Sequence, residues 1–270
     1  MSELEHPLTP RQSLLRVSDI CLSFAGVRAL VDVSFEVFEG EVLGIIGPNG
    51  AGKSSMLNVI NGLYRPQSGL IRYAGSELRH MPVQETAARG IARTFQNLAL
   101  FKGMTVLENV LTGRISKTRI GLFANALSLP SARREEAEQR ARVEGILELL
   151  EIQSVRDSIV GKLPYGLQKR VELARALAAE PKLLLLDEPM AGMNHGEKQD
   201  MSRFILDANE QLGTTVVLIE HDMGVVMGIS DRVVVLDFGR KIAEGAPDAV
   251  RANAAVISAY LGAAHPATVQ

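Results

Sequence analysis

The chain has 270 residues, which is enough for a large hydrophobic core and one or two domains. Its 29 Lys and Arg residues against 31 Asp and Glu residues give a net charge of −2. This balance argues against nucleic acid as the main partner, because such binding usually needs a basic face. The apolar stretches fall far short of the roughly 18 residues that span a membrane, and the N-terminus shows no secretory signal pattern.

The first elements predicted along the chain are a disordered lead-in and a pair of strands. Residues 1–12 carry two prolines and scattered charge, a composition typical of a disordered terminus. Residues 14–24 and 29–38 alternate between apolar and polar side chains, which predicts two antiparallel strands. Cys21 is the only cysteine and lies in the first of them, and its apolar neighbours predict a buried thiol in a reducing compartment.

A glycine-rich loop follows the next strand and matches the pattern G-x-x-x-x-G-K-[ST]. Residues 42–46 are a continuous apolar run, and residues 55–61 are a helical run that begins with Ser55, so the loop has the strand-loop-helix context that phosphate binding needs. Its backbone N–H groups and the helix N-terminus would cradle phosphate oxygens, with Lys53 reaching the β- and γ-phosphates and Ser54 ligating Mg²⁺. The alternative, a glycine turn with a chance lysine, does not explain this context. The loop consists of Gly47, Pro48, Asn49, Gly50, Ala51, Gly52, Lys53 and Ser54.

The middle of the chain is predicted to be mainly helical. Residues 70–73 predict a short strand, and residues 82–92 have a mixed, helix-like pattern. Apolar side chains recur at helical spacing within residues 133–152, and a second helix is predicted over residues 168–179. Residues 97–165 therefore look like a helical insertion.

Signals for a parallel sheet return in the last third of the chain. Residues 183–186, 215–219 and 233–236 are short apolar runs, which fit strands buried on both faces, and residues 246–262 predict a terminal helix. Together with the loop, this alternation predicts an α/β phosphate-loop NTPase core with a mainly parallel sheet, an antiparallel β subdomain and a helical subdomain insertion.

Two carboxylates end the apolar run at residues 183–186. In phosphate-loop enzymes Asp187 at this place would hold Mg²⁺ or its water shell, and the adjacent Glu188 would orient the water that attacks the γ-phosphate. The alternative is an exposed acidic strand end.

Five motifs in one order carry a resemblance to a known family. After the phosphate loop come Gln96 within residues 93–97, residues 163–170, the Asp187-Glu188 pair, residues 191–194, and His221 within residues 218–222. This set is similar to that of the ATP-binding subunits of ABC transporters. The resemblance implies one ATPase domain over residues 13–263, with a helical subdomain over about 97–172.

The resemblance also implies roles at matching positions. Phe24 would stack on adenine, although a core phenylalanine is an equally good interpretation. Gln96 would touch Mg²⁺ and the attacking water, or would be an ordinary polar loop residue. His221 would contact the γ-phosphate, although a lone histidine is more often structural. Residues 191–194 resemble the loop that crosses the interface between two such subunits.

The signature motif departs from the family wording Leu-Ser-Gly-Gly-Gln. Pro164 replaces the serine and Tyr165 the first glycine, while Gly166 is retained. Pro164 has neither a hydroxyl nor an N–H group, so a charge-assisted hydrogen bond of roughly 1.5–3 kcal/mol is lost if nothing compensates. The resemblance implies that Tyr165 and Gly166 cover the ATP of a facing subunit. We favour a working site, and the alternative is a degenerate one.

Finer features resemble the branched-chain amino acid uptake ATPases, among them the Tyr165-Gly166 pair and Asn194. His195 departs from that group, which usually has proline there, and an exposed loop residue is the default interpretation. The implied partners are a second ATPase subunit, identical or paralogous, membrane permease subunits, and indirectly a solute-binding protein. The implied location is the cytoplasmic face of the inner (plasma) membrane. The alternatives are an ATPase for lipid or lipopolysaccharide export and a soluble ABC ATPase without a transport role.

A cluster of apolar residues after Gln96 is a candidate surface for docking the permease. Subdomain core is an equally good interpretation of this cluster. Its members are Leu98, Leu100, Phe101, Met104 and Val106.

Overall fold

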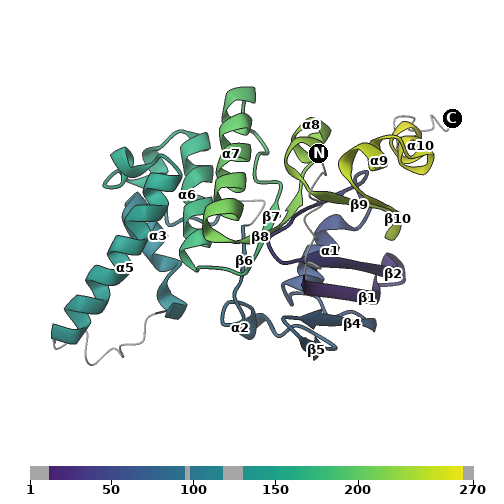
Figure 1. The fold of residues 1–270 in the computed structure, drawn as a ribbon, viewed down its shortest axis with the longest axis horizontal. Coiled ribbons are helices and arrows are strands. Elements are labelled where there is room, and N and C mark those ends of the chain that lie inside the picture. Colours follow the sequence, from purple (N-terminus) through teal and green to yellow (C-terminus); the bar gives the residue numbers. More distant parts are fainter. Residues whose placement is uncertain (1–11, 95–97, 118–129, 264–270) are drawn as a thin grey trace, which may run out of the picture.

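The computed structural model describes residues 12–94, 98–117 and 130–263, and the predicted lead-in lies almost wholly outside this part. A six-stranded sheet forms the centre of the molecule, with the strand order β10-β9-β3-β8-β7-β6 (Figure 1). All its neighbouring strands are parallel except the β9–β10 pair. The strands are β3 (Val42–Ile46), β6 (Ile91–Arg93), β7 (Leu183–Asp187), β8 (Thr215–Ile219), β9 (Arg232–Asp237) and β10 (Arg240–Gly245).

A second, four-stranded antiparallel sheet covers one side of the core. Its order is β2-β1-β4-β5, and the predicted pair of N-terminal strands, β1 and β2, forms one side of it. Helix α1 (Lys53–Ile60) contributes to the core cluster that joins this sheet to the parallel one. The predicted α/β phosphate-loop fold is confirmed. The strands are β1 (Ser13–Phe24), β2 (Val27–Phe38), β4 (Ser68–Tyr73) and β5 (Ser76–Leu78).

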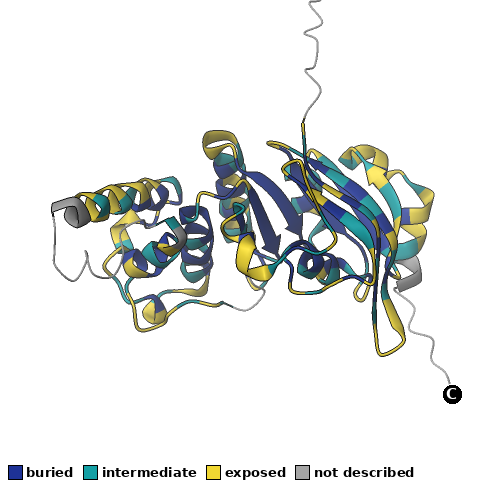
Figure 2. Cartoon of the chain, turned by 90° about the horizontal axis from the view of Figure 1, so that it is seen from below, coloured by how far each residue is buried: buried dark blue, intermediate teal, exposed yellow. Residues whose placement is uncertain are grey.

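Helices flank the other side of the parallel sheet and extend away from it (Figure 1). They pack on a second core cluster that includes Leu184 and Leu186, the side chains of β7 on the face opposite the first cluster. Burial of β3, β7 and β8 on both faces explains their continuous apolar runs (Figure 2). The helices of this cluster are α3 (Val106–Thr112), α5 (Pro130–Leu149), α6 (Tyr165–Ala178), α7 (His195–Leu212) and α8 (Met223–Ile229). Elsewhere, α2 (Val83–Thr86) follows β5 in the chain, and α9 (Pro247–Arg251) and α10 (Ala254–Ala263) pack on a third cluster with β9.

Several predicted elements differ from the structure at their ends. Within the helix-like segment 82–92 only α2 is helical, because Gly90 turns at φ +82° and Ile91 then pairs with Leu183 in the sheet. The helix predicted over 133–152 runs from Pro130 to Leu149, and the one predicted over 168–179 already begins at Tyr165.

The predicted C-terminal helix is two helices. Asn253 separates α9 from α10, and its side-chain oxygen accepts a hydrogen bond from the backbone N–H of Ala255 at 2.9 Å, which starts a new helix. The thiol of Cys21 is only half-buried, because strand alternation places it on the outer side of β1. There it donates to Asp32 Oδ1 at 3.1 Å.

Candidate functional site

The phosphate loop has a backbone that only glycine can adopt at two of its positions. Gly47 has φ +150° and Gly52 has φ +100°. A Cβ at Gly47 would lie 2.0 Å from the carbonyl oxygen of Leu236, and one at Gly52 would lie 2.6 Å from that of Ala29. The loop therefore fits between β9 and β2 only with hydrogens at these positions.

The cavity over the loop has a volume of about 230 Å³ and brings most of the predicted residues together. Residues from three other parts of the chain close it, namely Ala29 on β2, Glu188 after β7 and His221 after β8. Ala29 carried no signal in the sequence, because alanine at a strand end has no distinctive chemistry. The loop and helix residues that line the cavity are Asn49, Gly50, Ala51, Gly52, Lys53, Ser54 and Ser55.

Lys53 is folded back onto the loop from the first turn of α1. Its side-chain nitrogen donates to the carbonyl oxygens of Gly47 at 2.7 Å and Pro48 at 3.0 Å. Burial lowers the pKa of Lys53, and the nearby charges of Glu188 and Asp187 partly oppose this shift. An anion in the cavity would favour the charged ammonium further, so the site is built to receive negative charge.

The loop is also held from its outer side by the C-terminal region. Burial raises the pKa of the Tyr260 hydroxyl on α10, and the nearby backbone of Gly47 partly opposes this shift. Tyr260 packs on a core cluster that contains Ile46, the residue immediately before the loop. The backbone N–H of Gly239, in the β9–β10 turn, donates to the carbonyl oxygen of Ala51 at 3.0 Å.

Asp187 ends β7 with one carboxylate oxygen paired and the other not. Oδ2 accepts from Arg93 Nη2 at 2.8 Å, and both side chains are over nine-tenths buried. Oδ1 is buried without a hydrogen-bond partner among the residues that the structure describes. Such an oxygen is costly to bury alone and is the type of ligand that Mg²⁺ or its water shell prefers. Asp187 therefore fits the predicted metal role, with the Ser54 hydroxyl as the second protein ligand on the cavity wall.

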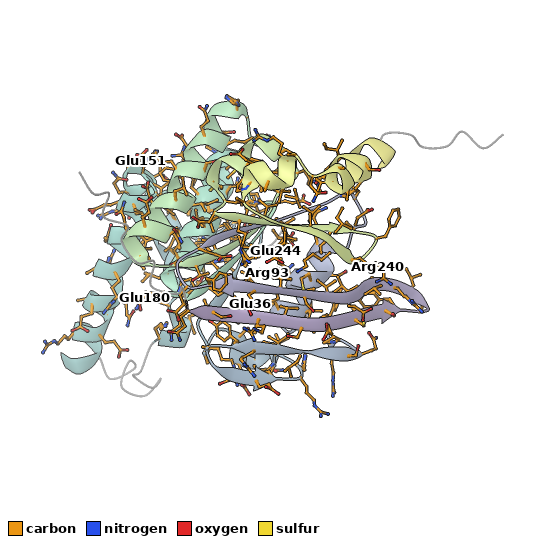
Figure 3. The ribbon with its side chains drawn as sticks, turned by 45° about the vertical axis from the view of Figure 1, so that its right-hand side comes forward. Glu36, Arg93, Glu151, Glu180, Arg240 and Glu244 are labelled. Carbon is orange, nitrogen blue, oxygen red and sulfur yellow. The ribbon has the colours of Figure 1, made fainter. Side chains whose placement is uncertain are left out.

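In the sequence, Arg93 is only the first residue of the motif at residues 93–97, and its pairing with Asp187 is not predicted. Its second guanidinium nitrogen donates to Asn58 Oδ1 on α1 at 2.5 Å, so one side chain connects β7 with α1. Arg93 lies in the middle of the molecule in Figure 3, whereas Glu151 and Arg240 lie toward its edges. Among the described segments, no group of three or more His, Cys, Asp and Glu side chains that could hold a metal ion is present.

Glu188 and His221 meet although 33 positions separate them in the chain. The imidazole Nε2 lies 2.5 Å from Glu188 Oε1, and both residues line the cavity. Adjacent parallel strands cause this contact, because β7 and β8 pair up to Asp187 and Ile219, and Glu188 and His221 follow one and two residues after that pair. Glu188 has a left-handed backbone at φ +50°, and its N–H donates to Ile219 O at 2.9 Å.

The other predicted site residues lie away from this cavity or outside the described chain. Phe24 is 44% exposed and packs edge-on against Tyr64, with ring centroids 4.9 Å apart, so the core interpretation of Phe24 is wrong. It does not line the cavity. Gln96 lies outside the described residues.

Tyr165 and Gly166 form the first turn of α6, which follows Pro164, and do not line the cavity either. A Cβ at Gly166 would lie 2.3 Å from Glu197 Oε1, and one at Gly192 would lie 3.2 Å from the Tyr165 ring. The start of α6 is thus packed against α7 and the loop before it.

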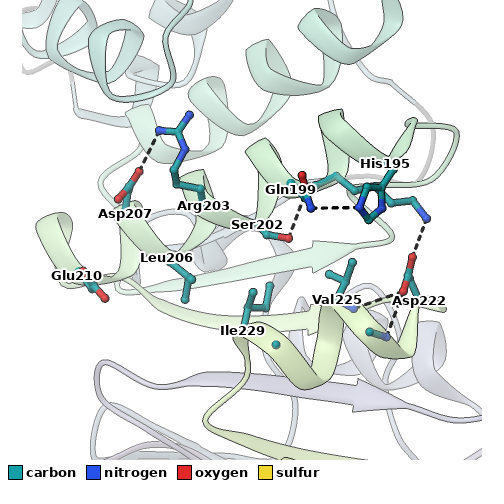
Figure 4. Close-up of a pocket in the computed structure, with 13 residues that line it drawn as sticks. His195, Gln199, Ser202, Arg203, Leu206, Asp207, Glu210, Asp222, Val225 and Ile229 are labelled. Atoms are coloured by element: carbon teal, nitrogen blue, oxygen red, sulfur yellow. Dashed lines mark hydrogen bonds and ion pairs between the residues drawn. The ribbon is translucent and has the colours of Figure 1, made fainter.

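His195 is the first residue of α7 and not a loop residue, because Asn194 caps the helix and accepts from the Glu197 N–H at 3.0 Å. Its ring contacts Gln199 at 3.1 Å on the rim of a groove of about 720 Å³ between α7 and α8 (Figure 4). At the same end of the groove, Lys198 pairs with Asp222 at 2.8 Å.

The predicted docking cluster is divided between surface and core. Phe101 is 52% exposed and Met104 is 39% exposed, whereas Val106 is fully buried. Leu98 and Leu100 are half-buried. Part of the cluster is therefore exposed, as a docking surface requires, and part of it belongs to the subdomain core.

A glycine cradle at a helix N-terminus, a lysine within it and carboxylates at the end of another strand of the same sheet define a phosphate-loop ATPase. The comparisons with known proteins make this class specific. The family model described as ABC transporter matches residues 30–191, and the model described as branched-chain amino acid ATP-binding cassette transporter matches residues 240–266. The chain belongs to the ABC transporter family of ATP-binding cassettes, whose characteristic activity is ATP hydrolysis. The predicted family is confirmed.

Individual relatives match this chain in sequence or structure over most of its length. The high-affinity branched-chain amino acid transport ATP-binding protein LivG of Escherichia coli (strain K12) is 40% identical over 253 residues, which are 94% of this chain and 99% of LivG. The crystal structure of an ATP-binding cassette of an ABC transporter in its ADP conformation is 34% identical, with a TM-score of 0.81, and the match covers 93% of this chain and 99% of that one. A dimeric cassette bound to ADP and Pi is 28% identical, with a TM-score of 0.72, over 86% of this chain and 98% of that one. Across the described ranges, none of the helices is long and apolar enough to cross a membrane.

Proposed function

We propose that the chain is the ATP-hydrolysing subunit of an importer for branched-chain or related amino acids. The similarity to LivG carries this proposal, because it extends over 94% of the chain, and the match of residues 240–266 to the branched-chain family model supports it. Export of lipids or lipopolysaccharide and a soluble ATPase without transport remain the competing functions, and neither is named among these relatives.

Different residues of the site bind different parts of ATP. The backbone N–H groups of residues 47–52 and of the first turn of α1, which includes Ser55, hold the phosphates. Lys53 neutralises the β- and γ-phosphates. Mg²⁺, when bound, would neutralise charge on the same phosphates, held by Ser54, Asp187 and Gln96. Phe24 stacks on the adenine ring.

Glu188 and His221 act on the γ-phosphate side of the cavity. Glu188 orients the attacking water, whose oxygen bonds to the γ-phosphorus while the bond from that phosphorus to the β–γ bridging oxygen breaks. His221 contacts the γ-phosphate, and Gln96 contacts the same water. The short contact between Glu188 and His221 supports these roles, because it holds both side chains at one wall of the cavity.

A second ATPase subunit completes the site. Tyr165 and Gly166 lie at the start of α6, away from the cavity of their own chain, and Tyr165 is 43% exposed, so this turn would cover the ATP of a facing subunit through the N-terminus of α6. The dimeric relative bound to ADP and Pi supports this arrangement.

The exposed side chains of Phe101 and Met104 are the proposed contact with a permease subunit. Docking there would hold the chain at the cytoplasmic face of the membrane. It would also transmit the closing of the two ATPase subunits around ATP to the transport path. The solute-binding protein would act on this chain only through the permease, and nucleic acid is not a partner.

Reconstitution tests the proposal. The chain is combined in proteoliposomes with candidate permease subunits and a candidate solute-binding protein from the same organism, and ATPase activity and uptake are measured with each of the common amino acids. Stimulation of both by leucine, isoleucine or valine is the expected result, and the Glu188→Gln variant is the inactive control. Stimulation by lipopolysaccharide in place of a loaded binding protein would overturn the import function.

A further inference from the structure

Glu220 is a buried carboxylate that none of the proposed catalytic roles uses. It follows β8 directly, between Ile219 and His221, and only 5% of its surface is exposed. Burial raises the pKa of this carboxyl group, and hydrogen bonds from two backbone N–H groups oppose that shift. A carboxylate in such a place is costly unless both of its oxygens are satisfied.

The two oxygens of Glu220 bind two different loops of the site. Oε1 accepts from the backbone N–H of Met190 at 2.7 Å, and Oε2 accepts from the backbone N–H of His221 at 3.2 Å. Met190 lies two residues after Glu188 and is fully buried, so its N–H group is fixed in the core. One side chain therefore joins the loop that carries Glu188 to the loop that carries His221.

These loops need such a connection because the sheet ends just before them. The β7–β8 ladder stops at the pair Asp187 and Ile219, and one further backbone bond follows, from Glu188 N–H to Ile219 O. Beyond that bond, the two hydrogen bonds of Glu220 join the loops beside the 2.5 Å contact between Glu188 and His221.

We propose that Glu220 is a positioning residue for ATP hydrolysis, which holds the Glu188 loop and the His221 loop at the separation that their catalytic contact requires. The inference rests on the proposed roles of Glu188 and His221. It adds that the segment beginning at Met190, which runs into the loop 191–194 proposed to face the second subunit, is tied to His221 by the same carboxylate. Movement of that loop on pairing of the subunits is then transmitted to His221.

The Glu220→Gln variant tests the positioning role. A glutamine has one acceptor oxygen, and its NH₂ group would face the second backbone N–H, so one of the two loops is released. A displacement of about 1 Å at a reacting group costs on the order of 100-fold in rate, so we expect kcat to fall 10- to 100-fold. The KM for ATP should stay within about twofold, because the phosphate loop is untouched.

Glu41→Gln is the matched control. Glu41 is 1% exposed and pairs with Arg232 at 2.9 Å, but it lies before β3, at the end of the sheet opposite the cavity. This variant should lose thermal stability and keep its kcat. An equal loss of kcat in both variants would mean that loss of any buried carboxylate lowers kcat, whatever its position, and would contradict the positioning role.

A double-variant cycle separates positioning from general support. If Glu220 acts through His221, Glu220→Gln combined with His221→Ala is no slower than His221→Ala alone. Losses that multiply, or a Glu220→Gln variant with the kcat of the unchanged chain, would overturn the inference. If Glu220→Gln does not fold, Glu220→Asp keeps the charge with a shorter reach and should give the same loss of kcat at constant KM. If the unchanged chain itself shows no ATPase activity, the proposed function fails, which is a different result from any of these.

Discussion

Replacement of Arg93 by methionine should destabilise the protein strongly in the absence of nucleotide. Arg93 and Asp187 are 7% and 5% exposed, and their charged atoms lie 2.8 Å apart. Methionine keeps most of the buried volume but leaves the Asp187 carboxylate without its cationic partner. Breaking a buried pair in this way costs about 3–5 kcal/mol, and for a chain of this size each kcal/mol lowers Tm by roughly 2–4 °C. We therefore expect Tm to fall by about 6–20 °C.

The same variant should regain more stability from MgATP than the unchanged chain does. Mg²⁺ held at Asp187 would neutralise the carboxylate that Arg93 no longer pairs, so the metal–nucleotide complex replaces part of the lost interaction. Denaturant unfolding with and without MgATP measures both effects. Arg16→Met is the control, because the Arg16–Glu36 pair is exposed to solvent and should contribute less than about 1 kcal/mol. A loss below about 1 kcal/mol for Arg93→Met would refute the argument that Asp187 depends on this partner.

Three further predictions concern catalysis and pH. Glu188→Gln should abolish turnover while ATP still binds, measured by single-turnover hydrolysis and nucleotide titration, and a normal rate would exclude Glu188 as the key carboxylate. Pro164→Ser should raise ATPase activity severalfold if the missing hydroxyl limits the rate, and no change would mean that the α6 N-terminus already compensates. The hydrogen bond from Lys198 lowers the pKa of Asp222, so the pair stabilises the fold above the ordinary pKa of aspartate and stops doing so as pH falls through the lowered value. Because Asp222 is over a third exposed, Lys198→Met should cost less than about 1 kcal/mol at pH 7 and less still near pH 3, and an equal cost at both pH values would contradict this.

The parts of the site that the sequence predicted are those whose signal is local. The phosphate loop combines a buried strand, glycines at fixed spacing and a helix start within twenty residues, and each of these is visible without knowing the fold. Asp187 and Glu188 were predicted for the same reason, because an apolar run that ends in carboxylates marks a strand edge. The structure places Glu188 in the wall of the same cavity as the loop, and Asp187 at the end of the adjoining strand β7.

Contacts between distant residues could not be predicted in this way. Arg93 binds a carboxylate 94 positions away, and Tyr260 packs from the far end of the chain on the cluster that contains Ile46, just before the loop. Glu220 has the sequence pattern of an exposed strand end, and its burial follows only from the packing of the Met190 loop over it. Short elements were missed for a related reason, since three-residue β6 owes its existence to β7 and not to its own composition.

The register of β7 against β8 determines which residues can do the chemistry. Asp187 pairs with Ile219, so Glu188 leaves the sheet one residue after this pair and His221 two residues after it, and both reach the phosphate cavity. A slip of one residue would turn His221 to the other face and remove its contact with Glu188. The ladder alone does not extend far enough to hold this contact, which is why a buried carboxylate at Glu220 is worth its cost in stability. The side chains of Glu188 and His221 thus meet within one chain, whereas Tyr165 and Gly166 lie away from the cavity, at the start of α6. Under the proposed function, the cover for the nucleotide would therefore come from a second subunit.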